Sequence, residues 1–164
     1  MSTEMCEAAL GYATERGWKV FPALIEDGKK KSHKSAKYSN GENWGATNDQ
    51  DEIRHDFAKW NAELVGIPTG PEQGFFVVEA DTLEGHKVDG IASLRALEAK
   101  HGPLPDTLMA ESPTGSLHCY FNWPSEGTIR NSTSKIGPGI DVRGQGGMVL
   151  GPPPLDRELA FIGG

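Results

Sequence analysis

Residues 74–81, with the sequence Gly-Phe-Phe-Val-Val-Glu-Ala-Asp, constrain the fold of this chain more than any other stretch. Four consecutive apolar residues, two of them β-branched, follow a glycine and lead directly into acidic residues. A short apolar run bounded by turn residues is typical of a buried strand rather than a helix. Because side chains alternate along a strand, Glu79 and Asp81 are expected on one face and Ala80 on the other.

Two carboxylates on one face at the end of a buried strand repel each other, and a bound cation relieves that repulsion. Oxygen ligands of this kind suit Mg²⁺ or Mn²⁺. Glu79 and Asp81 therefore predict a metal site. The alternative is a strand end at which both acids simply reach water.

The chain of 164 residues is expected to form one domain, 1–164, with a substantial core. Its 21 glycines and 11 prolines indicate many turns rather than a helical bundle. No stretch approaches the roughly 18 apolar residues of a membrane span, and the acidic N-terminus lacks the layout of a signal peptide. These two features predict no membrane partner. Cys6 and Cys119 form no CxxC pair, which predicts reduced thiols, no zinc site and a cytoplasmic protein.

The net charge of −7 excludes a generally basic nucleic-acid coat. The charge is uneven, however, because a lysine-rich stretch precedes a mainly acidic one, 49–63. We expect the lysine-rich stretch to be a solvated, mobile loop, and such loops are suited to phosphate contacts. Its lysines are Lys29, Lys30, Lys31, Lys34 and Lys37.

In the first half of the chain, apolar periodicity and turn residues predict three helices and three strands. The capping-box spacing that starts at Thr47 marks the second helix, and Pro22 is expected to end the first strand. The predicted helices are 2–17, 48–60 and the segment containing Ile91, Leu94 and Leu97; the predicted strands are 18–21, 64–67 and 75–81, with a long loop at 27–45.

The second half predicts a hairpin, with strands at 107–111 and 117–122 around a turn at 112–116. Residues 139–150 are expected to form two short strands around a glycine-rich turn. Three prolines at 152–154 then end the pairing, since proline cannot continue a ladder. The layout is α+β, with a mainly antiparallel sheet and helices packed on one face.

Three sequence-distant positions carry chemically versatile side chains on predicted strands. Glu79 and Asp81 end one strand, His118 lies inside an apolar strand, and Asp141 is flanked by apolar residues. Taken singly, Asp141 is explained by the wet face of a sheet, and His118 by a structural histidine. Taken together, the four residues are predicted to meet on one sheet surface beside glycine-rich turns.

Eight sequence blocks occur along nearly the whole chain in the order found in one known family. In them the chain resembles the primase–polymerase (prim-pol) domain of phage and plasmid replication proteins, in the archaeo-eukaryotic primase superfamily. The blocks are 9–13 with 17–22, 44–49, 66–70, 76–81, 102–107, 112–121, 137–144 and 147–153.

The resemblance implies an α+β fold with two parts. One is a palm-like sheet resembling an RNA-recognition motif, antiparallel or mixed, with packed helices; the other is a smaller N-terminal α/β subdomain. It also implies that Glu79, Asp81 and Asp141 hold divalent metal, Mg²⁺ or Mn²⁺ and two ions, with His118 as a further catalytic residue. Glu79 departs from the family's usual Asp and is one methylene longer, which shifts its reach.

A triphosphate substrate also needs hydrogen-bond donors and cations. The turn at 112–116, through Ser112, Thr114, Gly115 and Ser116, is suited to phosphate oxygens together with His118. Arg143 can pair with phosphate bidentately, and Lys135 is a further candidate. Trp44 or Tyr38 would offer a stacking surface to a template base. The candidate DNA contacts are Lys30, Lys31, Lys34, Lys37 and Arg130.

These features predict a DNA primase/polymerase that joins dNTPs or NTPs on a single-stranded DNA template or primer. The resemblance implies that the chain is an N-terminal part of a longer replication protein, with helical accessory and helicase domains, in a bacterial or archaeal host cytoplasm. Two alternatives remain open. One is a metal-dependent nuclease or phosphohydrolase, and the other is a catalytically weak module that binds single-stranded DNA or nucleotide.

Overall fold

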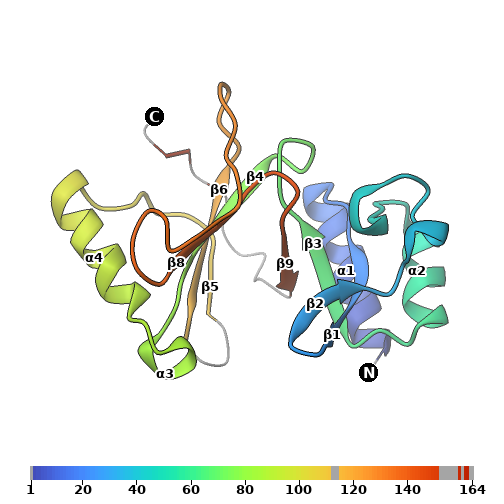
Figure 1. The fold of residues 1–164 in the computed structure, drawn as a ribbon. Coiled ribbons are helices and arrows are strands. Elements are labelled where there is room, and N and C mark those ends of the chain that lie inside the picture. The colour runs from blue at the N-terminus through green and yellow to red at the C-terminus, as the bar shows by residue number, and fades with distance from the viewer. Residues whose placement is uncertain (1, 112–114, 152–158, 160, 163–164) are drawn as a thin grey trace. The chain divides into compact units, whose positions relative to one another are not determined.

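The computed structural model describes residues 2–111, 115–151, 159 and 161–162, and Figure 1 shows its helices and strands. The chain divides into two compact units. The N-terminal unit is Met1–Pro68 with Met148–Pro152, and the second unit is Thr69–Gly147 with Pro153–Gly164. Each unit has its own antiparallel sheet, which confirms the predicted α+β class.

The N-terminal unit is a four-stranded sheet in the order β2-β1-β3-β9, accompanied by two helices. In this unit, α1 and α2 contact each other, and they also contact β3 and β1 respectively. The elements are α1 (Ser2–Arg16), β1 (Phe21–Glu26), β2 (Lys29–Ser32), the short 3₁₀ turns η1 (Ala36–Tyr38) and η2 (Asn43–Gly45), α2 (Gln50–Lys59), β3 (Leu64–Pro68) and β9 (Met148–Gly151).

The lysine-rich stretch is not the long loop expected from its composition. Residues 29–32 form β2, which pairs with β1 through a two-residue turn, because Glu26 lies opposite Lys29 in the register. Asp27 and Gly28 have φ values of 52° and 74°, which are the positive values that a type I′ hairpin turn requires. The Asp-Gly pair was therefore the sequence signal for this hairpin.

The expected strand at 18–21, ending at Pro22, is also wrong in its bounds. β1 begins at Phe21 and continues through Pro22. Proline removes one N–H from a ladder, but here the loss falls at the end of the β1–β2 pairing, where the His33 N–H still donates to the Pro22 carbonyl (2.9 Å). Val20 forms an isolated bridge to Thr47.

The second predicted helix exists, but Asp49 rather than Thr47 caps it. The Asp49 carboxylate accepts a hydrogen bond from the Glu52 N–H (2.9 Å), and the Thr47 hydroxyl accepts one from the Asp49 N–H (3.1 Å). A carboxylate at this position satisfies a free helical N–H and interacts favourably with the helix dipole. The helix consequently starts two residues later than the spacing indicated.

One face of the N-terminal sheet is closed by an aromatic pair. The Phe21 ring stacks on Trp44 with centroids 5.4 Å apart and an interplanar angle of 8°. A Cβ at Gly66 would lie 2.2 Å from the Phe21 ring, so the ring lies directly over this glycine. Position 66 consequently accepts no larger side chain without displacing Phe21.

The second unit is a five-stranded sheet in the order β5-β6-β4-β8-β7, with every pairing antiparallel. The pairing of β5 with β6 confirms the expected hairpin, although its first strand begins at Met109 rather than at Thr107 and residues 112–114 of its turn lie outside the described residues. The elements are β4 (Phe75–Ala80), α3 (Leu83–His86), α4 (Gly90–His101), β5 (Met109–Glu111), β6 (Leu117–Asn122), β7 (Ser132–Thr133) and β8 (Ile140–Arg143).

The hydrophobic core of the second unit lies between α4 and one face of its sheet. Leu94 is buried there with Val78, Ala80 and Phe121, and Ile140 completes this contact from β8. The two short strands expected within 139–150 exist, but they belong to different sheets and do not form a hairpin. The glycine-rich segment between them therefore connects the two sheets.

Two further sequence predictions concern the cysteines and the membrane. Cys6 and Cys119 are both free thiols, and Cys119 is buried. Burial raises the pKa of Cys119 to about 11, so the thiol form predominates at neutral pH. Among the described residues, none of the helices combines the length and apolar character needed to cross a membrane.

Candidate functional site

A row of polar side chains crosses the sheet of the second unit on the face opposite α4. Glu79, on the central strand β4, lies opposite His118 of β6 on one side and Asp141 of β8 on the other. Side chains of directly opposed residues project to the same face of an antiparallel sheet. The fold therefore brings Glu79, His118 and Asp141 together, as the sequence predicted.

The adjacent row on the same face is largely apolar. It consists of Tyr120, Val77 and Arg143 in register, and both Tyr120 and Val77 are fully buried. Phe75 continues this buried surface, with its ring stacked 5.6 Å from that of Tyr120. The face thus changes from apolar to charged along β4. Its buried apolar side chains lower the local dielectric around the neighbouring carboxylates.

Arg143 contacts both carboxylates of the row. Its Nη2 lies 3.4 Å from Glu79 Oε2 and 3.6 Å from Asp141 Oδ2. Both distances exceed those of strong charge-assisted hydrogen bonds. One guanidinium faces two carboxylates, so this group of three side chains keeps a net negative charge.

The buried carboxylate of Glu79 has one oxygen without a hydrogen bond. Glu79 is 5% exposed, and its Oε1 has no hydrogen-bond partner within the described part of the chain. Buried carboxylate oxygens are normally paired or bound to metal. This oxygen and the neighbouring Asp141 therefore fit a hard divalent cation in the chemistry of their donor atoms.

A complete metal-binding group is not assembled by these side chains. Across residues 2–111, 115–151, 159 and 161–162, no three His, Cys, Asp or Glu side chains lie close enough together to hold an ion. Asp81 lies one residue beyond β4, where its N–H still donates to the Gly139 carbonyl (2.9 Å). Continued alternation places Asp81 on the same face as Glu79, so its participation as a ligand stays a prediction.

Two glycines allow the backbone to close around Asp81. The Gly90 N–H donates to the Asp81 carbonyl (2.8 Å), which joins the start of α4 to the end of β4. A Cβ at Gly90 would lie 2.1 Å from the Gly139 carbonyl oxygen. This close approach requires glycine at position 90 and fixes the backbone on both sides of Asp81.

A backbone amide positions Asp141, and no sequence pattern predicts this contact. The Ser134 N–H donates to Asp141 Oδ1 (3.2 Å), and to the Ile140 carbonyl (2.9 Å). Ser134 has a φ of 52°, a conformation unusual for a residue other than glycine. Nothing in the polar stretch 128–139 indicated which amide would point at Asp141.

The predicted phosphate-binding turn is described in part. Ser112 and Thr114 lie outside the described residues. Gly115 has a φ of 85°, and a Cβ there would lie 3.3 Å from the Thr82 methyl group. The end of the turn therefore lies beside the residue that follows Asp81. Ser116 is buried, whereas Lys135 is exposed.

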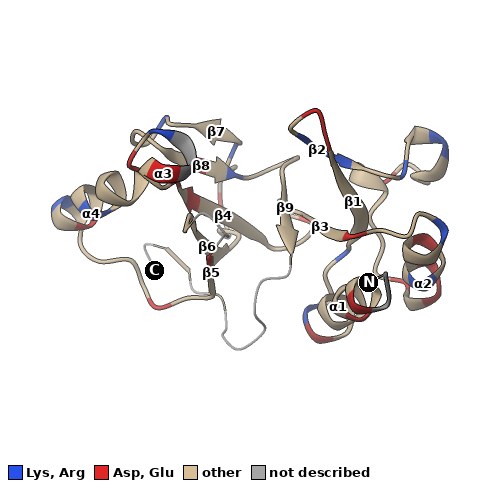
Figure 2. Cartoon of the chain, turned by 90° about the horizontal axis from the view of Figure 1, so that it is seen from below, with Lys and Arg blue, Asp and Glu red and all other residues tan. Residues whose placement is uncertain are grey.

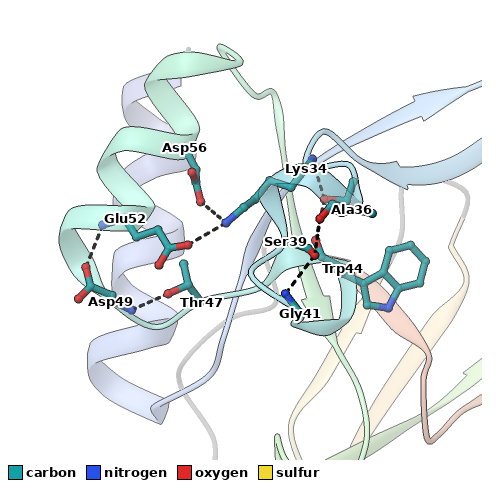
Figure 3. A network of polar contacts seen from close by, with 10 residues as sticks. Lys34, Ala36, Ser39, Gly41, Trp44, Thr47, Asp49, Glu52 and Asp56 are labelled. Carbon is teal, nitrogen blue, oxygen red and sulfur yellow. Dashed lines mark hydrogen bonds and ion pairs between the residues drawn. The ribbon is translucent and has the colours of Figure 1, made fainter.

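Lys34 does not belong to a mobile surface loop. It is 5% exposed, and its Nζ lies 2.7 Å from Asp56 and 3.0 Å from Glu52. Figure 3 shows this ammonium reaching from its loop to the two carboxylates of α2. Both ion pairs are formed inside the unit. The buried Lys34 ammonium is therefore poorly placed to contact a DNA phosphate.

The other predicted DNA contacts are on the surface. Lys30, Lys37 and Arg130 are exposed, whereas the exposed Lys31 pairs with Glu26 across the β1–β2 hairpin (2.8 Å). Figure 2 colours the charged residues on the ribbon, with the acidic residues of α2 in red. Of the two predicted stacking residues, Trp44 already stacks on Phe21, and Tyr38 is 38% exposed.

A comparison with protein families identifies the family of this chain. The family model described as "Bifunctional DNA primase/polymerase, N-terminal" matches residues 9–158. The chain belongs to this Prim-Pol family. Membership supports DNA primase/polymerase activity, a nucleotidyl transfer, in general, and enzymes of the family generally depend on divalent metal. None of the curated proteins compared with the chain matches it.

Proposed function

We propose that this chain carries out template-directed nucleotidyl transfer from dNTPs or NTPs on single-stranded DNA, with divalent metal held by Glu79, Asp81 and Asp141. The single observation that supports this most is the position of Glu79. It lies between Asp141 and His118 in register and keeps one buried carboxylate oxygen without a hydrogen bond to any residue that the structure describes. A buried, unsatisfied carboxylate is costly unless a cation binds it.

The chemistry that bound Mg²⁺ or Mn²⁺ supplies in such a site is activation of the attacking 3′-oxygen and neutralisation of the departing pyrophosphate. The protein's part is to hold its carboxylates at fixed positions. The sheet register does this for Glu79 and Asp141, the Ser134 amide orients Asp141, and the Gly90–Gly139 contact fixes the backbone of Asp81.

Arg143 has two roles in this proposal. Without substrate, it offsets part of the repulsion between Glu79 and Asp141 at distances of 3.4 and 3.6 Å. These long contacts are weak, so the guanidinium can exchange them for the oxygens of a triphosphate, to which it pairs well. His118 and the turn residues Ser112, Thr114, Gly115 and Ser116 would donate to the same phosphates, with Lys135 as an additional cation.

The proposed partners follow from the same reaction. Exposed Lys30, Lys31, Lys37 and Arg130 are candidates for template or primer phosphates. Helical accessory and helicase domains in a longer protein, and a host cytoplasm, belong to this proposal because the resemblance to phage and plasmid replication proteins implies them. The full span 1–164 would then act as the catalytic domain.

Primer extension with Mg²⁺ or Mn²⁺ tests the proposal directly. Glu79→Gln, Asp81→Asn and Asp141→Asn each keep the side-chain shape and remove a negative charge, so incorporation should fall by at least about a hundredfold. Glu126→Gln, an equivalent change at an exposed acid of the same unit, is the matched control. Equal incorporation by all variants would refute the metal-binding role.

One alternative has an observation in its favour. Arg143 already contacts two carboxylates, and no three-ligand group is assembled among the described residues. Both facts are compatible with a module that binds DNA or nucleotide without turnover. Binding that needs no metal, together with no incorporation by the unsubstituted chain, would favour this alternative. Degradation of labelled DNA without added nucleotide would instead indicate a nuclease.

A further inference from the structure

Trp60, the C-cap residue of α2, lines two hollows in the N-terminal unit. One hollow has a volume of about 330 Å³ and is also lined by His33 and Leu24. The other has a volume of about 290 Å³ and is also lined by Tyr38 and Lys37. Trp60 therefore borders both hollows, and each hollow is near the lower limit of small-ligand sites.

Two further aromatic rings surround the indole. The His33 ring is nearly parallel to it, with centroids 6.3 Å apart and an interplanar angle of 15°. The Tyr38 ring meets it edge-on, at 5.4 Å and 78°. Burial lowers the pKa of His33, so this imidazole is neutral at pH 7. Three uncharged aromatic surfaces, two from the segment 33–38 and one from the end of α2, thus converge.

Cationic side chains border the same rings. Lys59 Nζ lies 3.8 Å from the Tyr38 ring centroid and 4.7 Å from that of Trp60, and Lys37 Nζ lies 5.4 Å from Tyr38. Both lysines are exposed.

Acidic residues also line these hollows, and one buried lysine compensates part of their charge. Glu52 and Asp56 face the smaller hollow, and both are paired with the buried Lys34. Glu63 lines the larger hollow. In the smaller hollow, the three lysines Lys34, Lys37 and Lys59 outnumber the two carboxylates, so this hollow keeps one net positive charge for an anion.

We propose that Trp60, Tyr38 and His33, with Lys37 and Lys59, form a subsite for one nucleotide unit, whose base stacks on the aromatic rings and whose phosphate binds the ammonium groups. Planar bases have a π-face that stacks on aromatic side chains regardless of sequence. A single-stranded DNA and a free nucleotide offer the same chemistry. This inference rests on the proposed function, because it takes nucleic acid or nucleotide as the ligand.

Binding of a 5′-labelled oligo(dT) to the full chain, measured by fluorescence anisotropy in EDTA without added nucleotide, tests the subsite separately from catalysis. The double variant Lys37→Gln/Lys59→Gln and the variant Trp60→Ala should each weaken binding by about tenfold or more. Lys100→Gln, at an exposed lysine of α4, is the control for loss of a lysine charge elsewhere in the chain and should bind like the parent.

Two further variants distinguish stacking from a structural role of the rings. Tyr38→Phe keeps the ring and should retain binding, whereas Tyr38→Ala should lose it while circular dichroism still shows a folded protein. Competition by unlabelled dTTP separates the two ligand sources: displacement indicates a free-nucleotide site, and no displacement indicates a strand site.

Unchanged affinity of the folded double lysine variant would overturn the proposal, as would an equal loss in Lys100→Gln. Asp141→Asn should bind oligo(dT) like the parent even where it abolishes primer extension. Loss of extension with intact oligo(dT) binding therefore concerns the proposed catalytic site alone, and loss of binding in the lysine and Trp60 variants concerns the subsite.

Discussion

Glu79 and Asp141 lie directly opposite each other on neighbouring antiparallel strands, and the Arg143 guanidinium is within 3.6 Å of both carboxylates. The two acids are distant in the sequence, and the sheet alone brings them together. Their mutual repulsion is offset in part by one cation, so the same arrangement influences both the stability of the sheet and its affinity for other cations.

Replacing Arg143 by Met should show how far the guanidinium offsets the repulsion between Glu79 and Asp141. Loss of the guanidinium leaves Glu79 and Asp141 without their shared cation, so the free energy of unfolding should fall by on the order of 1 kcal/mol. Mn²⁺ should then raise the melting temperature of Arg143→Met more than that of the parent, because the uncompensated carboxylates gain more from the ion. Differential scanning fluorimetry with and without Mn²⁺ measures both effects. An identical Mn²⁺ shift in the two proteins would contradict this expectation.

Glu79→Asp should distinguish the effect of the carboxylate's charge on activity from the effect of its side-chain length. The variant restores the acid that the family usually carries at this position and keeps the negative charge that Glu79→Gln removes. We expect Glu79→Asp to retain primer extension within about tenfold of the parent, with an altered ratio of Mg²⁺- to Mn²⁺-supported rates, because the carboxylate is displaced by one methylene. Rates measured with each ion in turn provide the test. Equal inactivity of both variants would show that side-chain length matters as much as charge.

Lys34→Met should destabilise the protein without affecting the exposed lysines. The substitution leaves the carboxylates of Asp56 and Glu52 without their cation, and removal of one partner from a buried ion pair costs about 3–5 kcal/mol. Urea denaturation measures this loss, and Lys30→Met, at an exposed position of β2, is the control. A change below about 0.5 kcal/mol, the size of an ordinary surface substitution, would contradict the structural role.

The stability of the protein should also depend on His33 at mildly acidic pH. Burial lowers the pKa of His33 in the folded state, so the unfolded chain binds the proton more readily. Stability should therefore be complete above the ordinary histidine pKa of about 6.5 and should fall as the pH drops below it. His33→Gln should lessen this fall, whereas His101→Gln, at an exposed position, should not. Urea midpoints at pH 7.5 and 5.5 provide the comparison.

Much of the acidic row was predictable because strand alternation is a local property. The apolar run before Glu79 and the apolar neighbours of Asp141 and His118 marked three strands, and the fold class followed from them. The order of those strands in the sheet comes from long-range packing, so the sequence predicted a shared sheet surface but not that β4 lies between β6 and β8.

Other features depended on contacts that no local pattern encodes. The burial of Lys34 is determined by two carboxylates on α2, so its lysine-rich surroundings indicated the opposite. β2 was missed because its side chains are charged, although the Asp27-Gly28 turn marked the hairpin. Trp60 was assigned only to the end of a helix, since its neighbours His33 and Tyr38 come from a separate segment.

Because Glu79 and Asp141 lie opposite each other, the proposed enzyme activity should depend on the correct register between β4 and β8. If β8 slipped by a single residue against β4, Asp141 would turn toward Leu94 and its apolar neighbours, and Ile140 or Val142 would replace it at the acidic row. A misaligned molecule would still contain an antiparallel sheet, and far-ultraviolet circular dichroism would barely distinguish it from the native one. Specific activity per molecule would therefore measure the correctly aligned fraction of a preparation.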